Sequence, residues 1–238
     1  GCQILIAKDR KIFFNRSYGY HTYKKLIQVK NTDIYDLASI TKIAATLPML
    51  MKMVDNNDLK INNKISEYLP LDTTNKKDVI IKEVLAHQSG LQPWIPFYRK
   101  TLIKDSISGL MQLRDTLYST SQNDTFPYQV AENIYLHYSY QDSLDYYIYS
   151  SELSEDKSYD YSDLGFYLFK KIIENTYSDS LHKIVDMKFY QQLGMVNLEY
   201  LPLKRVDVDC IVPTEDDIEY RSQLIRGYVH DMGAAMQG

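Results

Sequence analysis

The clearest indication of the fold is the segment Ile34-Tyr-Asp-Leu-Ala-Ser39-Ile-Thr-Lys42. It leads into residues 40–54, which are apolar on nearly every side and therefore indicate a buried helix. A serine three residues before a lysine lies on the same face of such a helix. The lysine amine can then accept the hydroxyl proton while the serine oxygen attacks a carbonyl carbon. Ser39 is therefore a candidate nucleophile and Lys42 its candidate base.

The same Ser-x-x-Lys spacing occurs three times in the chain, so its surroundings have to decide between the matches. The pair Ser154 and Lys157 lies in a charged stretch, where water would keep the lysine protonated. A third match begins at Ser180, which is expected to be the N-cap of an amphipathic helix. Only Ser39 opens a buried helix, whose N-terminus favours an oxyanion and whose burial favours a neutral amine. The alternative is that Ser39 merely caps this helix and Lys42 extends its amine to solvent.

Two strands and a kinked helix are expected in the first quarter of the chain. Residues 3–7 and 11–20 predict a hairpin that turns at residues 8–10. Pro48 lies within the buried helix and is expected to kink it, because a proline inside a helix costs about 3 kcal/mol unless the structure relieves it.

The remainder of the chain is expected to be mainly helical. A short helix is predicted over residues 79–86, and two amphipathic helices over residues 164–177 and 181–193, the last of them closed by glycine. Residues 101–156 mix short helical patterns with polar clusters, which favours a helical subdomain with long loops. From residue 198 onward, prolines and acidic residues indicate irregular structure.

The chain is interpreted as a single domain over its 238 residues, of which 45% are hydrophobic. Within it we expect an N-terminal hairpin over residues 1–30, a mostly helical part that carries the motifs over residues 31–200, and an irregular segment over residues 201–238. The formal net charge of −4 comes from interspersed acids and bases, so nucleic acid is not an expected partner.

No stretch reaches the roughly 20 apolar residues that a membrane-spanning helix needs, and no signal peptide is visible in the chain. Because the sequence begins at Gly1 and opens directly into a strand, the true N-terminus is expected to lie upstream. Cys2 and Cys210 fit either one long-range disulfide or two unrelated buried thiols.

Several segments resemble the serine β-lactamase and penicillin-binding-protein family, especially its class C-like esterases and peptidases. The similar segments are Ile34–Lys42, Asn57-Asp-Leu-Lys-Ile-Asn62, Ile65-Ser-Glu-Tyr-Leu-Pro70 and Leu85-Ala-His-Gln-Ser-Gly-Leu91. The resemblance implies an α/β (α+β) fold of β-lactamase/transpeptidase type, with an antiparallel sheet flanked by helices and an all-helical subdomain. It also implies that His87 is structural, as a histidine at a helix end usually is.

Tyr161-Ser-Asp163 resembles the second motif of this family, in which the tyrosine passes a proton to the leaving group. The third residue of that motif is usually asparagine, whose amide can donate to a substrate carbonyl. Asp163 is a candidate substrate-binding residue, but an ionised carboxylate only accepts hydrogen bonds, which puts recognition of amides and β-lactams in doubt. Read without the resemblance, Asp163 could simply be the N-cap of the next helix.

The third motif of the family, Lys-Thr-Gly or His-x-Gly, is not found. Gly227-Tyr-Val-His-Asp231 and Ala234-Ala-Met-Gln-Gly238 resemble the stretch that leads into it, so the resemblance implies a chain truncated at its C-terminal end, with an incomplete sheet and active site. The opening of the chain and its end resemble the serine hydrolase half of Bacteroidetes envelope proteins that carry an N-terminal glycoside hydrolase of family three. Such a fused glycosidase and a periplasmic, envelope or secreted location are therefore expected.

These observations predict a serine hydrolase that acts through an acyl-enzyme on an ester or amide, such as a cell-wall peptide, a D-amino-acid peptide or a β-lactam-like compound. The catalytic residues would be Ser39, Lys42 and Tyr161, with no metal or cofactor, and this fragment would be weakly active or inactive without its third motif. The alternatives are a catalytically idle binding module of the same fold, accessory to a fused glycosidase, and an interaction scaffold built on the tyrosine-rich middle.

Overall fold

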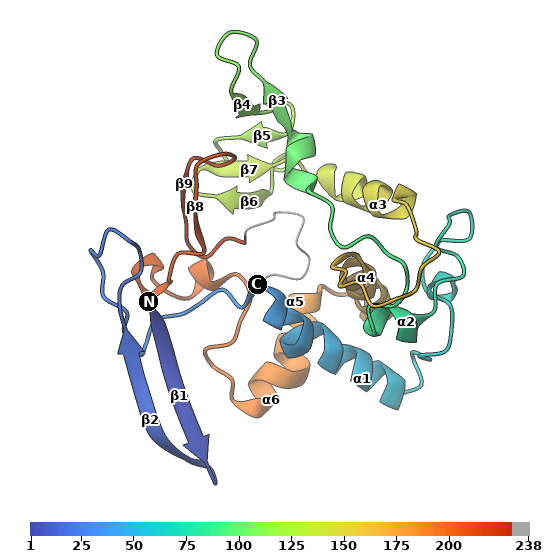
Figure 1. Cartoon of the computed structure of the whole chain (residues 1–238), viewed down its shortest axis with the longest axis horizontal. Helices are drawn as coiled ribbons and strands as arrows, with labels where there is room; N and C mark the ends of the chain where they lie inside the picture. Colours follow the sequence, from blue (N-terminus) through green and yellow to red (C-terminus); the bar gives the residue numbers. More distant parts are fainter. Residues whose placement is uncertain (230–238) are drawn as a thin grey trace.

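The chain begins with a long antiparallel hairpin, formed by β1 (Cys2–Lys8) and β2 (Lys11–Tyr18) in a computed structural model that describes residues 1–229. Asp9 and Arg10 both have positive φ, 50° and 64°, the backbone of a two-residue turn that suits the twist of a hairpin. The predicted hairpin is thus confirmed. Its apolar side chains face solvent, with Phe13 66% exposed, and Figure 1 shows the hairpin standing apart from the helices.

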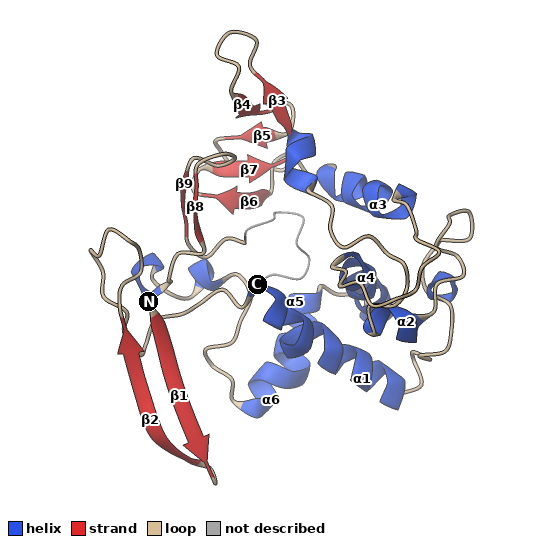
Figure 2. Ribbon diagram, viewed as in Figure 1, coloured by secondary structure: helices blue, strands red, loops and turns tan. Residues whose placement is uncertain are grey.

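Short strands and helices make up the rest of the described chain (Figures 1 and 2). The helices are α1 (Leu47–Asp55), α2 (Ile81–Leu85), α3 (Tyr140–Ser150), α4 (Leu164–Tyr177), α5 (Leu181–Val185) and α6 (Gln191–Leu193). The strands are β3 (Leu102–Lys104), β4 (Met111–Leu113), β5 (Tyr118–Ser119), β6 (Tyr128–Ala131), β7 (Ile134–Leu136), β8 (Glu215–Asp217) and β9 (Gln223–Ile225). They form antiparallel sheets in the orders β1-β2, β3-β4, β5-β7-β6 and β8-β9. The mixed α/β class is therefore confirmed.

The hydrophobic core lies where α1, α2, α4 and α5 meet. The core side chains of these helices are fully or almost fully buried; they include Met49, Leu50 and Met53 of α1, Leu164, Phe169, Ile172 and Ile173 of α4, and Ile184 and Val185 of α5. Burying one such side chain contributes roughly 1.5–3 kcal/mol. Gly165 lets α4 approach α2 closely, because a Cβ at this position would lie 2.1 Å from Cγ1 of Val84.

Pro48 does not kink α1, contrary to the expectation. It lies in the first turn of α1, where a missing N–H leaves no helical hydrogen bond unmade. The irregularity comes just before it, because Lys42–Thr46 forms a π-helical turn. The predicted helix over 40–54 is therefore a short 3₁₀ turn (Ala38–Ile40), a π turn and α1 in succession.

The expectation of a helical middle is wrong for residues 102–136. This region consists of β3 to β7, and α3 is the helix that follows them. The buried hydroxyls of Tyr118 and Thr101 lie 2.8 Å apart, and those of Tyr118 and Tyr220 lie 2.6 Å apart. Tyrosine hydroxyls thus connect the sheet of β5, β7 and β6 to the loop between β8 and β9. The chain from residue 198 onward is also more regular than expected, because β8 and β9 form a hairpin.

The helices predicted over 164–177 and 181–193 are confirmed, the second as α5, a π turn and α6. Gly194 ends it with a positive φ of 65°. None of the helices in the described part of the chain is long and apolar enough to cross a bilayer. Cys2 and Cys210 are not joined in a disulfide, and Cys2 is exposed, so neither prediction for this pair holds.

Lys76 is a fully buried lysine that ties the loop before α2 to the end of α3. Its Nζ lies 2.6 Å from the carbonyl oxygen of Ser151, 3.3 Å from that of Tyr149 and 2.9 Å from Oδ1 of Asn75. Three acceptors match the three N–H donors of an ammonium group. Burial nevertheless lowers the pKa of Lys76 to about 8, because the charged form loses its hydration.

The folded protein is expected to gain stability from Lys76 as the pH rises from 8 to 10.5. In this interval the unfolded lysine still holds its proton while the folded one has released it, so unfolding takes up a proton and becomes less favourable as the pH rises. The full effect corresponds to about 3 kcal/mol. Urea unfolding of the wild type at pH 7.5 and 10 should show this gain relative to Lys76→Met. The exposed neighbour Lys77 provides the control, Lys77→Met, and equal pH dependence in both variants would contradict the assignment.

Candidate active site

The candidate nucleophile lies in a turn held by its own sequence. Asp36 Oδ1 accepts the backbone N–H of Ala38 at 2.7 Å, and Ala38 has a positive φ of 46°, which is uncommon for alanine. The 3₁₀ turn Ala38–Ile40 follows, with the Ser39 side chain exposed. Lys42 opens the π turn and is only 5% exposed. Ser39 is therefore accessible to a substrate, whereas its partner lysine is shielded from water.

Lys42 is the centre of the predicted catalytic group. Its Nζ donates a hydrogen bond to Ser39 Oγ at 3.1 Å and lies 2.6 Å from Oδ1 of Asp163. The same atom lies over two rings, 5.2 Å from the centroid of Tyr161 and 5.6 Å from that of Phe166. The structure thus brings together all four predicted residues, Ser39, Lys42, Tyr161 and Asp163, from segments far apart in the sequence.

The carboxylate of Asp163 contacts the lysine. Asp163 occupies the N-cap position of α4, as the alternative interpretation expected, but its side chain makes no capping hydrogen bond, and Oγ of Ser162 accepts the N–H of Leu164 at 3.2 Å. The sequence motif gave no indication of the contact between Asp163 and Lys42, which joins residues 121 positions apart in the chain.

The other two Ser-x-x-Lys pairs lie at the surface. Lys157 is half exposed and pairs with Glu83 at 2.7 Å, and Lys183 pairs with Asp179 at 3.2 Å. Ser180 occupies the N-cap position of α5, but its hydroxyl makes no capping hydrogen bond. Both amines are thus open to solvent, unlike the buried amine of Lys42.

A turn after α2 holds the segment that carries Tyr161. Oγ of Ser162 donates to the carbonyl of Gln92 at 2.6 Å, and the N–H of Asp163 donates to the carbonyl of Pro93 at 2.9 Å. Gly90 brings residue 154 against the same turn, because a Cβ at Gly90 would lie 2.2 Å from the carbonyl oxygen of Ser154, and its φ is +78°. The segment Leu85–Leu91, interpreted from sequence as structural, thus positions the second motif.

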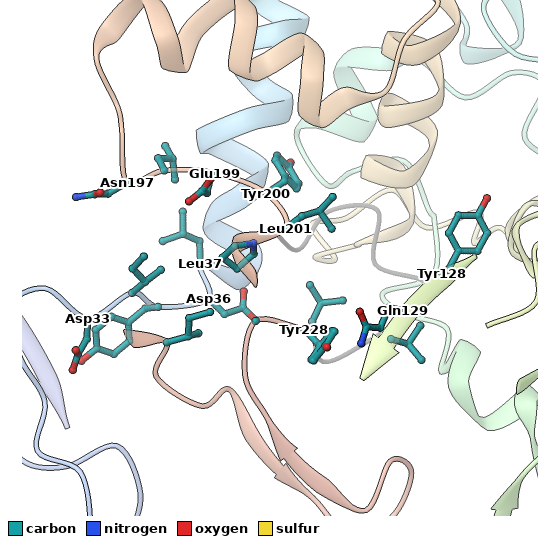
Figure 3. Close-up of a pocket in the computed structure, with 18 of the residues that line it drawn as sticks. Asp33, Asp36, Leu37, Tyr128, Gln129, Asn197, Glu199, Tyr200, Leu201 and Tyr228 are labelled. Carbon is teal, nitrogen blue, oxygen red and sulfur yellow. The ribbon is translucent and has the colours of Figure 1, made fainter. Parts of the chain in front are cut away.

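A cavity of about 520 Å³ lies beside the nucleophile segment (Figure 3). Asp36 and Leu37 line it on one side, and Tyr128, Tyr200 and Tyr228 lie around it. Burial raises the pKa of Tyr200, so its hydroxyl stays protonated. Neither the three predicted catalytic residues nor Asp163 line this cavity, which therefore adds nothing to their assignment.

Two further features concern what the site could bind. Residues 1–229 contain no group of three or more His, Cys, Asp or Glu side chains arranged to hold a metal ion. The part of the sequence expected to lead to the third motif begins at Gly227, and its residues from 230 onward lie outside those that the structure describes.

Comparisons with known proteins agree with this fold. A protein-family model described as Beta-lactamase matches residues 1–207. An N-acetylmuramyl-L-alanine amidase from Bacillus subtilis (strain 168) is 25% identical over 256 residues, which cover 97% of this chain and 52% of the amidase.

Two solved structures have a similar fold. An octameric penicillin-binding protein homologue from Pyrococcus abyssi has a TM-score of 0.62 at 19% identity, over 98% of this chain and 48% of the homologue. A class C β-lactamase has a TM-score of 0.61 at 18% identity, over 98% of this chain and 54% of that enzyme. The chain thus spans about half the length of these relatives. The predicted β-lactamase/transpeptidase-like fold is confirmed.

Proposed function

Because the chain belongs to the β-lactamase family, as its motifs predicted, we propose that it is a serine hydrolase in which Ser39 forms an acyl-enzyme. The observation that carries the proposal is the 3.1 Å hydrogen bond between Lys42 Nζ and Ser39 Oγ. It joins an exposed hydroxyl to a buried amine at the start of the helical core. The pairs at 154/157 and 180/183 lack this environment, since their lysines pair with surface carboxylates.

The proposed reaction starts when Lys42 takes the proton of Ser39 and the oxygen attacks the carbonyl carbon of the substrate. Negative charge develops on the carbonyl oxygen near the helix N-terminus, which favours it. Lys42 returns the proton through the Tyr161 hydroxyl to the leaving group, and the bond from the carbonyl carbon to that group breaks. Water then attacks the acyl-enzyme, with Tyr161 or Lys42 as base, which releases the acid and restores Ser39.

Asp163 has a different role in this proposal from the substrate contact predicted by its motif position. At 2.6 Å from Lys42 Nζ, its carboxylate holds the amine beside Ser39. A carboxylate cannot donate to a substrate carbonyl, so the site favours substrates that direct either an N–H group or no hydrogen-bonding group toward Asp163. Peptides can direct an N–H group toward it, and esters have none.

We propose a substrate of the cell-wall type, either a D-amino-acid peptide or an ester or amide related to it, and an envelope location. The support is the relative named as an N-acetylmuramyl-L-alanine amidase, and the fold shared with a penicillin-binding protein homologue. Fusion to an N-terminal glycoside hydrolase of family three belongs to the same proposal and rests on the resemblance of the two ends of the chain.

A fluorophosphonate probe and a fluorescent penicillin test the proposed function on the full-length protein. The expected result is one covalent adduct per chain, located by peptide mass spectrometry on the tryptic fragment that contains Ser39. A substrate panel with an acetate ester, a D-alanyl-D-alanine peptide and a chromogenic β-lactam then orders the substrate classes, with the ester expected to exceed the β-lactam. An adduct on any other serine would contradict the assignment of the nucleophile.

A second candidate function is a binding module with an idle site. The 2.6 Å contact between Lys42 Nζ and Asp163 favours it, since the carboxylate competes with Ser39 for the amine. In that case the protein would bind cell-wall peptides without labelling by the fluorophosphonate. Stoichiometric labelling of Ser39 excludes this candidate.

A further inference from the structure

His87 lies outside the predicted catalytic set, yet it brackets Tyr161 on both sides. Its carbonyl oxygen accepts the backbone N–H of Asp160 at 2.9 Å. Its ring atom Nδ1 accepts the backbone N–H of Ser162 at 3.1 Å. One residue of the turn after α2 therefore binds the backbone N–H groups of the two residues that flank the candidate proton-transfer tyrosine.

The imidazole ring also packs on the tyrosine itself. The ring centroids of His87 and Tyr161 lie 4.5 Å apart at an interplanar angle of 34°. The rings of Tyr159 and Phe166 also lie near the imidazole, with centroids at 6.0 and 5.8 Å. The ring of Tyr161 thus contacts both the imidazole of His87 and Nζ of Lys42.

His87 directly follows the C-cap residue of α2 and adopts the left-handed backbone conformation that commonly ends a helix, with φ of 55°. The N–H of Gln88 donates to the carbonyl oxygen of Glu83 at 2.8 Å across this turn. A non-glycine residue enters this region at a cost of roughly 1–2 kcal/mol. The helix ending and the hydrogen bonds to residues 160 and 162 both hold His87 in this conformation.

The hydrogen bond from Ser162 requires neutral His87. A backbone N–H can only donate, so Nδ1 must present its lone pair, and the neutral ring then carries its proton on Nε2. Burial, followed by the nearby Lys42 charge, lowers the pKa of His87 from its usual 6.5, and Asp163 opposes this shift. Tyr159 and Tyr161 are the other titratable groups that face the ring. The ring is therefore neutral at pH 7.

We propose that neutral His87 is a positioning residue for Tyr161, and that protonation of its Nδ1 releases residues 160–162 and slows acyl transfer at acid pH. This inference rests on the function proposed above for Ser39, Lys42 and Tyr161. The direction of this pH effect follows from the geometry. The hydrogen bond from Ser162 to His87 is present above the pKa of His87 and is lost as the pH falls through that value, which lies below 6.5.

The kinetic test compares ester hydrolysis by the wild type, His87→Asn and His87→Phe between pH 4.5 and 8. Asparagine tolerates positive φ and offers an acceptor near the place of Nδ1, but does not titrate. Phenylalanine keeps the ring packing and lacks the acceptor. His87→Phe is expected to lower kcat by about 10²-fold at pH 7 with little change in KM, since a misplaced proton donor affects the chemical step. His87→Asn should lose less kcat and should lack the acid decline of the wild type.

His182→Asn is the matched control, because burial also lowers the pKa of His182 and this residue lies on α5. Its pH profile should equal that of the wild type. Amide hydrogen exchange provides a second test that needs no activity. The N–H of Ser162 should exchange faster in His87→Phe than in the wild type, and faster in the wild type at pH 5 than the intrinsic pH dependence of exchange predicts.

The outcomes separate the inference from the proposed function. Absence of Ser39 acylation in the wild type contradicts the function, and with it the catalytic half of the inference, while the exchange measurement still decides the structural half. An acid decline that persists unchanged in His87→Asn, or Ser162 protection that is unaltered in His87→Phe, overturns the role of His87 even if Ser39 is acylated.

Discussion

Ser39→Ala is expected to remove covalent labelling completely and to lower ester turnover by a factor of about 10³ or more, with the fold unchanged. The hydroxyl of Ser39 is exposed and hydrogen-bonds to Lys42, so its removal leaves no buried cavity. The loss arises because no other group in the site can form the acyl-enzyme. Intact-protein mass spectrometry after fluorophosphonate treatment measures labelling, and initial rates with an acetate ester measure turnover.

Ser154→Ala is the matched control for this experiment. Ser154 has the same spacing to Lys157 as Ser39 has to Lys42, and its hydroxyl accepts the N–H of Asp156 at an exposed site. Labelling and turnover should equal those of the wild type. Labelling that persists in Ser39→Ala would move the nucleophile elsewhere and would remove the basis of the proposed function.

Lys42→Met is expected to reduce the rate of Ser39 acylation by about 10²–10⁴-fold, the range associated with loss of a general base. It should also destabilise the fold by about 1–3 kcal/mol, because Asp163 then keeps a partly buried charge without its partner. Stopped-flow labelling measures the first effect and urea unfolding the second. Lys157→Met, which breaks a surface ion pair, should change neither by a comparable amount.

A paired variant separates the catalytic role of Lys42 from its structural role. In Lys42→Met with Asp163→Asn, the uncompensated carboxylate is gone, so most of the lost stability should return. The acylation rate should stay low, since the base is still absent. Recovery of the rate together with the stability would mean that Lys42 acts only by holding the fold, and this would contradict its assignment as the base.

The parts of the fold that the sequence predicts well are those with long local patterns. Helix α4 has 14 residues with clear helical periodicity, and both of its ends match the prediction. The β1–β2 hairpin was predicted from two apolar runs around a short polar turn. By contrast, β3 to β7 contain only two to four residues each, too few for alternation to be distinguished from helical periodicity.

The residues of the candidate site also divide into those that a local pattern indicates and those that only the folded chain brings together. Spacing alone could not select Ser39 and Lys42 from three matches; the buried helix start and the resemblance of the surrounding segments to the family favoured this pair. The contact of Asp163 with Lys42 and the bracket that His87 forms around Tyr161 join segments far apart in the chain, 75 residues apart for the bond from Ser162 to His87. No local pattern encodes such pairing, so charge and packing around each residue could be assessed only from the folded structure.

The turn at residues 87–93 has a consequence for how this protein becomes functional during folding. Its hydrogen bonds to Ser162 close loops of 70 to 75 residues. Contacts of such sequence separation form after local helices and hairpins, since the loop entropy must be overcome first. Helix formation alone therefore cannot assemble the reactive group. On this ordering, the proposed proton-transfer residue Tyr161 would join Ser39 and Lys42 only after these long-range contacts form.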